Sequence, residues 1–128
     1  ANEVSIIPII FYLGAIFWTL GYDTIYGFQD IKDDEIIGLK STSIKFKREP
    51  FIFLLTCYVI LFLMLVVLGI LNNFNIFYYV FSLIIGYHLF FYQLRGVDLK
   101  SPVNCMKVFK SNNLLGFLVF IQLLISKI

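Results

Sequence analysis

Three aspartates near the end of the first apolar stretch are the residues of this chain best suited to chemistry. Asp23, Asp30 and Asp34 stand seven and then four positions apart. On one continuous α-helix, with about 100° of rotation per residue, their side chains would lie within about 40° of one direction. The spacing therefore predicts a single acidic edge, directly after a hydrophobic run that is long enough to cross a bilayer.

An edge of carboxylates needs a cation or water to offset the repulsion between its charges. Mg²⁺ is a suitable cation, because it typically uses one or two carboxylates together with the oxygens of a phosphate substrate. Lys40, just beyond a helix stop predicted at Gly38, is a compact cation that could bind the same phosphate. The pattern thus fits a site for a magnesium-bound phosphate compound. The alternative is a solvated acidic face where the helix leaves the membrane.

The composition places the acidic edge in an all-α membrane protein. Hydrophobic residues make up 60% of the 128 positions and charged residues 14%, a balance that a soluble domain of this length could not bury in one core. Residues 4–22 carry no charge and are long enough to cross a hydrocarbon layer of about 30 Å. No basic segment precedes them, and acids follow in place of a small-residue cleavage site. We therefore expect a retained helix rather than a signal peptide.

Four transmembrane helices are expected, in one membrane domain that covers residues 1–128. Residues 50–94 contain no Asp, Glu, Lys or Arg, and a cluster of asparagines near residue 73 divides this run into two spans. The last apolar run is short for a full crossing unless it begins near Ser111 or tilts. The expected helices cover residues 4–30, 51–71, 76–94 and 111–126, with loops at 31–50 and 95–110.

The basic residues orient this bundle. Lysines and arginines gather between spans one and two and between spans three and four, whereas the turn between spans two and three has none. With four alternating crossings, both basic loops lie on one side, which the positive-inside rule makes the cytoplasmic side, or the matrix side in a mitochondrion. The acidic edge therefore shares a membrane face with the second basic loop. No basic stripe interleaved with aromatics stands on a soluble element, so we expect no nucleic-acid partner.

The second basic loop contains a short helical signal. Ser101 is a suitable N-cap and Pro102 a suitable first helical residue. The simplest interpretation is an amphipathic helix on the membrane surface. His88, alone within the third span, has two interpretations. It is either a relay or substrate contact, or a histidine that is hydrogen-bonded to a neighbouring helix.

The residues around the acids resemble a known motif. Nine positions match in register: Tyr22, Asp23, Tyr26, Asp30, Asp33, Asp34, Gly38, Lys40 and Ser41. Together they resemble the second aspartate-rich motif of the UbiA family of membrane prenyltransferases, and most closely its 4-hydroxybenzoate polyprenyltransferase branch. A second set of positions is similar to the tail of that family: Pro102, Cys105, Phe109, Asn112 and Gly116. The resemblance covers essentially the whole chain.

The resemblance implies an enzyme of ubiquinone synthesis, which transfers a polyprenyl group from polyprenyl diphosphate to the ring of 4-hydroxybenzoate. In that chemistry Asp30 and Asp34 hold Mg²⁺, which neutralises the diphosphate as the C–O bond breaks. The allylic cation is then attacked by the ring carbon ortho to the hydroxyl. The substrate contacts expected from the resemblance are Lys40 for the diphosphate, Asp23, Tyr26 and Asn112.

The resemblance also implies a larger protein. Complete family members resemble nine-helix bundles in which two aspartate-rich motifs face each other, and nothing in residues 1–22 matches the first motif. We therefore expect the C-terminal part of such a bundle, working with an N-terminal half in a bacterial or mitochondrial inner membrane. Two alternatives stay open. One is a UbiA-type enzyme with another acceptor, such as another quinone precursor or haem, and the other is a non-enzymatic membrane subunit.

Overall fold

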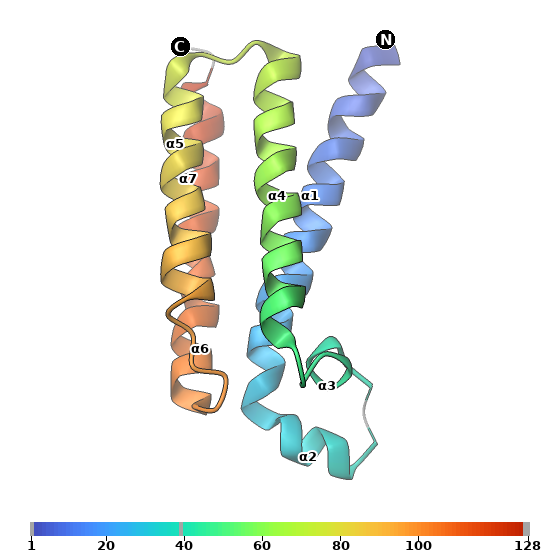
Figure 1. Ribbon diagram of the computed structural model, residues 1–128. Coiled ribbons are helices and arrows are strands. Elements are labelled where there is room, and N and C mark those ends of the chain that lie inside the picture. Colours follow the sequence, from blue (N-terminus) through green and yellow to red (C-terminus); the bar gives the residue numbers. More distant parts are fainter. Residues whose placement is uncertain (1, 39, 127–128) are drawn as a thin grey trace.

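Four long helical stretches lie side by side in the computed structural model, which describes residues 2–38 and 40–126 (Figure 1). The main elements are α1 (Asn2–Gly27), α4 (Pro50–Asn72), α5 (Ile76–Tyr87) with a π-helical extension (His88–Leu94), α6 (Pro102–Lys110) and α7 (Asn112–Ile125). Within the described residues, four stretches are long and apolar enough to cross a membrane: Ile6–Ile36, Pro50–Asn72, Ile76–Leu94 and Pro102–Ile125. The prediction of an all-α integral membrane protein with four spans is confirmed.

The last span is longer than predicted. α6 occupies residues that were expected to form a loop, and it continues into α7 because Ser111 keeps helical backbone angles. The polar residues at this junction do not stop the helix, since their side chains bond to carbonyls of the preceding turn. Ser111 Oγ donates to the Val108 carbonyl, and Asn112 Nδ2 donates to the Phe109 carbonyl. The predicted helix at 111–126 is found as α7, and the predicted short helix is found as α6, with Ser101 as its N-cap and Pro102 at its start. The two are nearly continuous, so that Pro102–Ile125 forms one 24-residue stretch that is long enough to cross a membrane.

The first span bends where a straight helix was predicted. α1 ends at Gly27, a 3₁₀ turn follows (Phe28–Asp30), and α2 (Ile31–Ile36) then lies across the end of the bundle (Figure 1). Asp30 has left the helical region, with φ −118° and ψ 22°. The three aspartates therefore do not share one continuous helix, and the straight acidic edge is wrong as a geometry.

A short helix holds the end of α1 in this bend. α3 (Thr42–Lys45) docks on α1 through hydroxyl groups. Ser43 Oγ donates to the Thr24 carbonyl at 2.7 Å, and the Oγ atoms of Thr24 and Thr42 lie 2.6 Å apart. Gly27 permits this approach, because a Cβ atom there would overlap the Ser43 side chain. The sequence between α1 and α4 is thus a packed cap on the bundle rather than an open loop.

Close contact between α1 and α4 forms the core of the bundle. A Cβ atom on Gly21 would lie 2.5 Å from Cε1 of Tyr58, and one on Gly14 would lie 3.2 Å from Cβ of Met64. Small residues at such positions let membrane helices approach closely. The buried residues around this contact include Ile25, Leu54, Tyr58, Leu61, Leu65, Leu89 and Leu115.

Gly21→Ala should destabilise the bundle by about 1–2 kcal/mol, because the added methyl group displaces the buried Tyr58 ring. Gly116→Ala is the matched control, since its Cβ would meet only Trp18 Cη2 at 3.4 Å, an ordinary contact. The control should be neutral or slightly stabilising, because alanine is a better helix former than glycine. Unfolding in mixed detergent micelles would measure both variants. Equal stability of the two would contradict close packing at Gly21.

The two ends of the bundle differ in chemistry. At one end, Asn75 caps α5 by accepting from the Tyr78 N–H, and its Nδ2 donates to the Ile125 carbonyl at 2.9 Å. α2, α3 and the turn between the π-helix and α6 all lie at the other end (Figure 1). The two basic segments therefore share one end of the bundle, as the loop charges predicted.

Candidate functional site

An open cavity of about 1030 Å³ lies where the two basic segments meet. Its walls come from the 3₁₀ turn and α2, from the start of α4, and from the turn before α6. Its charged lining residues are Asp30, Lys32, Asp33, Glu35, Lys47, Arg48 and Lys100. Apolar side chains such as Phe28 and Leu99 complete the walls. We call this the charged cavity.

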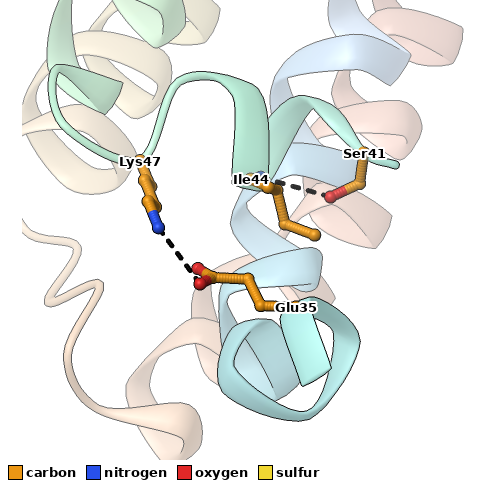
Figure 2. Close-up of polar contacts among 4 residues, drawn as sticks. All are labelled: Glu35, Ser41, Ile44 and Lys47. Atoms are coloured by element: carbon orange, nitrogen blue, oxygen red, sulfur yellow. Dashed lines mark hydrogen bonds and ion pairs between the residues drawn. The ribbon is translucent and has the colours of Figure 1, made fainter. Parts of the chain in front are cut away.

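An ion pair links two walls of the charged cavity. Lys47 Nζ lies 3.0 Å from Glu35 Oε2, which joins α2 to the segment before α4 (Figure 2). Both side chains are well exposed, at 46% and 36%, so the pair contributes less than about 1 kcal/mol to stability. Nearby, Ser41 Oγ caps α3 by accepting from the Ile44 N–H at 3.2 Å (Figure 2). These contacts set the position of the walls more than they add to stability.

The structure separates the residues that the sequence grouped as one site. Asp30 lines the charged cavity, whereas Asp34 is half-buried one turn further along α2 and is not part of the lining. Asp23 is exposed on α1, two turns before Asp30. Lys40 is exposed and also lies outside the lining. Among the predicted groups, Asp30 therefore has the most direct access to a ligand in this cavity.

The cavity is also lined by cations that the sequence analysis used only to orient the bundle in the membrane. Lys47, Arg48 and Lys100 line the same cavity as Asp30, from two segments about fifty residues apart in the chain. Their clustering in the basic loops was the one available signal. Charge counting could not show that these two loops form one cavity, because that depends on how the spans pack.

An aromatic wall runs along α1 toward the 3₁₀ turn that carries Asp30. Trp18, Tyr22 and Tyr26 follow one another at four-residue intervals on α1, and Phe109 of α6 packs on the last two. Ring centroids are 5.6 Å apart for Trp18 and Tyr22, 5.7 Å for Tyr22 and Phe109, and 4.7 Å for Tyr26 and Phe109. Tyr26 thus lies one turn from Asp30, between the charged cavity and the deeper aromatic side chains.

A buried polar network, which sequence reasoning missed, centres on Gln93. Gln93 Oε1 accepts from Tyr58 Oη at 2.7 Å, and its Nε2 donates to Asn112 Oδ1 at 3.0 Å. The same Nε2 lies 3.2 Å from His88 Nδ1. Asn112 Oδ1 also accepts from Trp18 Nε1 at 2.8 Å. Side chains from all four spans therefore meet at one point. The sequence indicated His88 and Asn112, but it did not single out Gln93, an uncharged residue in an apolar run, and His88 bonds to this residue of its own helical stretch.

The donor set suits a hard divalent ion that is shared with a ligand. In the described residues, no group of three or more His, Cys, Asp or Glu side chains could hold a metal ion. Mg²⁺ does not require such a group, because it commonly binds one or two carboxylates and takes its other ligands from water and phosphate oxygens. Asp30 offers a carboxylate in an open cavity where cations supply the opposite charge. The residues present fit Mg²⁺ bound together with a phosphate compound.

Comparisons with a family model and with known proteins point to the same family. The model described as UbiA prenyltransferase family matches residues 1–121. A 4-hydroxybenzoate octaprenyltransferase of Francisella tularensis subsp. novicida is 34% identical over 131 residues, which cover 99% of this chain and 44% of that protein. The mitochondrial 4-hydroxybenzoate polyprenyltransferase of Dictyostelium discoideum is 36% identical over 117 residues, which cover 91% of this chain and 25% of that protein.

This chain spans less than half the length of these relatives. No solved structure matches it significantly. The family model covers nearly all of the chain, including the acids, the aromatic wall and the Gln93 network. The chain belongs to the UbiA prenyltransferase family.

Proposed function

We propose that this chain binds the diphosphate of a polyprenyl diphosphate, in an enzyme that transfers the polyprenyl group to the ring of 4-hydroxybenzoate in ubiquinone synthesis. Family membership supports aromatic prenyl transfer in general, and both relatives described above are named for this acceptor. The charged cavity is the observation on which the proposal depends. It combines carboxylates and cations at one end of a membrane bundle, where a lipid with a charged head group can enter.

Arg48 and Lys100 are the cations that we propose for the diphosphate. In the part of the chain that the structure describes, the one ion pair joins Lys47 to Glu35, so neither Arg48 nor Lys100 is committed to a carboxylate. The guanidinium of Arg48 can bind two phosphate oxygens at once, whereas Lys100 acts as a point charge. The two residues come from different segments, so together they can hold the head group from two sides. Lys40 remains a predicted contact from outside the cavity lining.

UbiA-family prenyltransferases are generally metal-dependent, and Mg²⁺ is the ion we propose. Asp30 would be its direct ligand, with Asp34 as a second ligand one turn away and Asp23 as a supporting group. When bound, the ion would neutralise the leaving diphosphate. We propose that Tyr26, one turn from Asp30, presents its ring face to a developing allylic cation. These roles are proposals that rest on the charges and placement of the side chains.

We propose that the polyprenyl tail lies in the membrane-spanning part of the bundle. A small apolar cavity of about 100 Å³ lies between α1, α4 and α7, and its lining includes Phe11, Leu61 and Val119. It lies deeper in the bundle than the charged cavity, where an isoprenoid chain would be among apolar side chains. We propose that the head group stays at the charged end while the tail follows α1 into the bilayer.

Two further observations support the orientation and the partner segment that we propose. The basic residues at the charged end support a cytoplasmic orientation in a bacterial inner membrane, or a matrix orientation in a mitochondrial inner membrane. The chain covers 44% and 25% of the two relatives. We propose that a further segment, with the first acidic motif that the resemblance implies, completes the active site opposite Asp30.

Product analysis tests the reaction itself. The chain, supplied within a whole-length enzyme, is incubated with polyprenyl diphosphate and 4-hydroxybenzoate, and the prenylated ring is identified by mass spectrometry. We expect prenylation at the carbon ortho to the hydroxyl. Transfer only to a different ring would show that the proposed acceptor is wrong and the proposed enzyme class is right. No transfer to any ring, with the diphosphate still bound, would contradict the proposed function.

Arg48→Gln should raise the KM for polyprenyl diphosphate roughly tenfold, the usual effect of losing a charge-assisted hydrogen bond. Lys45→Gln is the matched control. Lys45 belongs to the same basic segment, but its ammonium lies 5.7 Å from the Phe46 ring centroid and it does not line the cavity. Steady-state kinetics at varied diphosphate concentration would compare the two. An equal increase in KM for both variants would indicate general electrostatic attraction instead of a site at Arg48.

A further inference from the structure

The ion pair between Glu35 and Lys47 belongs to the wall of the charged cavity. Both residues line it, Glu35 from α2 and Lys47 from the segment before α4. Lys47 Nζ lies 3.0 Å from Glu35 Oε2 (Figure 2). One of the cations that surround this cavity is therefore bound to a carboxylate of the protein itself, across two separate wall segments.

The pair is also the main polar attachment of α2. None of the residues of α2 is buried. Among the hydrogen bonds of the described residues, the bond from Lys47 is the only one that joins an α2 side chain to another element. Both partners are well exposed, and an exposed ion pair contributes little to stability. The pair can therefore open at little cost when a better acceptor for the lysine is present.

A diphosphate is a better acceptor than a carboxylate, because it carries more negative charge and offers more oxygens to charged donors. Lys47 is suited to a change of partner. Its ammonium has three donors on a flexible stem, whereas the guanidinium of the neighbouring Arg48 is a rigid planar fork. An ammonium can thus move from one acceptor to another without a change in the backbone.

We propose that Lys47 is a third cation for the diphosphate and that Glu35 competes with the diphosphate for it. The pair opens when the diphosphate binds and closes again when the diphosphate leaves. The ligand class rests on the function proposed above. Glu35 then opposes binding, since its carboxylate must give up Lys47 and stays close to an anionic ligand. It is a specificity residue, because an anion gains the contact with Lys47 only if it displaces the carboxylate.

A double-mutant cycle on binding tests this exchange. Isothermal titration calorimetry measures the Kd of inorganic diphosphate at saturating Mg²⁺, on a whole-length enzyme that contains this chain. Glu35→Gln should lower the Kd roughly threefold, because it frees Lys47 and removes an opposing charge. Lys47→Gln should raise the Kd. In the Lys47→Gln background, Glu35→Gln should tighten binding by a smaller factor, since no pair is left to open.

Glu49→Gln is the matched control. Glu49 is an exposed acid at the same end of the bundle, it does not line the cavity, and it forms no ion pair among the described residues. Its Kd should stay near that of the unchanged enzyme. Equal tightening by Glu35→Gln with and without Lys47 would overturn the proposal, because the pair would then stay closed around the ligand and only tie α2 to the wall. Unaltered or weaker binding by Glu35→Gln would overturn it as well.

The result is separable from that of the proposed function. If inorganic diphosphate binds without coupling between the two residues, while 4-hydroxybenzoate is still prenylated, only the exchange is wrong. If the coupling is present but no ring is prenylated, the exchange is right and the proposed reaction is wrong. If inorganic diphosphate does not bind at all, both proposals are wrong.

Discussion

Asp30→Asn should reduce prenyl transfer by roughly a hundredfold or more when the chain works within a whole-length enzyme. The amide has the shape of the carboxylate but no charge, so it holds a divalent ion poorly, and stabilisation of a leaving group is worth several kcal/mol. Asp34→Asn should have an effect of the same kind through the second proposed ligand. Single-turnover transfer measured against Mg²⁺ concentration would show whether more metal partly restores the rate.

Glu49→Gln supplies the control for both aspartate variants. Glu49 is exposed, lies between Arg48 and Pro50 of the cavity wall, and does not line the cavity itself. Glu49→Gln removes the same charge from the same end of the bundle. Because Glu49 does not line the cavity, the transfer rate of this variant should stay near that of the unchanged enzyme. Unchanged turnover in both Asp30→Asn and Asp34→Asn would refute the proposed metal site. A comparable loss of transfer rate in Glu49→Gln would mean that the aspartate effect comes from the overall negative charge at this end of the bundle and not from a metal site.

Gln93→Leu should destabilise the bundle by about 2 kcal/mol. Gln93 is completely buried, and its loss leaves the Tyr58 hydroxyl without its acceptor and Asn112 without one of its donors. An unpaired polar group in an apolar interior costs about 1–3 kcal/mol, and hydrogen bonds between membrane helices fall at the lower end of that range. Unfolding of the chain in mixed micelles, followed by circular dichroism, would measure the loss.

A double-mutant cycle isolates the bond between Tyr58 and Gln93. Tyr58→Phe alone should cost less than Gln93→Leu, because it leaves the bonds of Gln93 to Asn112 intact. Adding Tyr58→Phe to Gln93→Leu should cost nothing further, since the hydroxyl has already lost its partner. Strictly additive losses would show that the two side chains do not interact in the folded bundle.

The Gln93 network also joins all four spans of the bundle. Trp18 and Tyr58 belong to α1 and α4, while Gln93 and Asn112 belong to the π-helical turn and α7. A wider turn of the π type shifts the side chains that follow it around the helix, and here it accompanies a fully buried glutamine. One buried cluster thus holds the edge of the Trp18 ring and joins α1, α4, the π-helical stretch and α7.

The amino-acid sequence alone determined the class of this protein, its spans and its family. Uncharged runs such as 50–94 are long enough to cross a bilayer wherever they pack, and the positions of Lys and Arg place both basic segments at one end. The aspartates around Asp30 carry the family motif in their spacing. These features are local in the chain, so they can be read without knowing how the helices meet.

Only the tertiary structure decided which side chains share a site. The bend at Asp30 depends on α3 docking on α1, and it separates Asp34 from the cavity that Asp30 lines. The charged cavity gains Arg48 and Lys100, and Lys40 stays outside it. The contact of Trp18 with Asn112 joins residues 94 positions apart. Such contacts follow from the close packing of whole helices, which spacing and hydropathy along the chain do not specify.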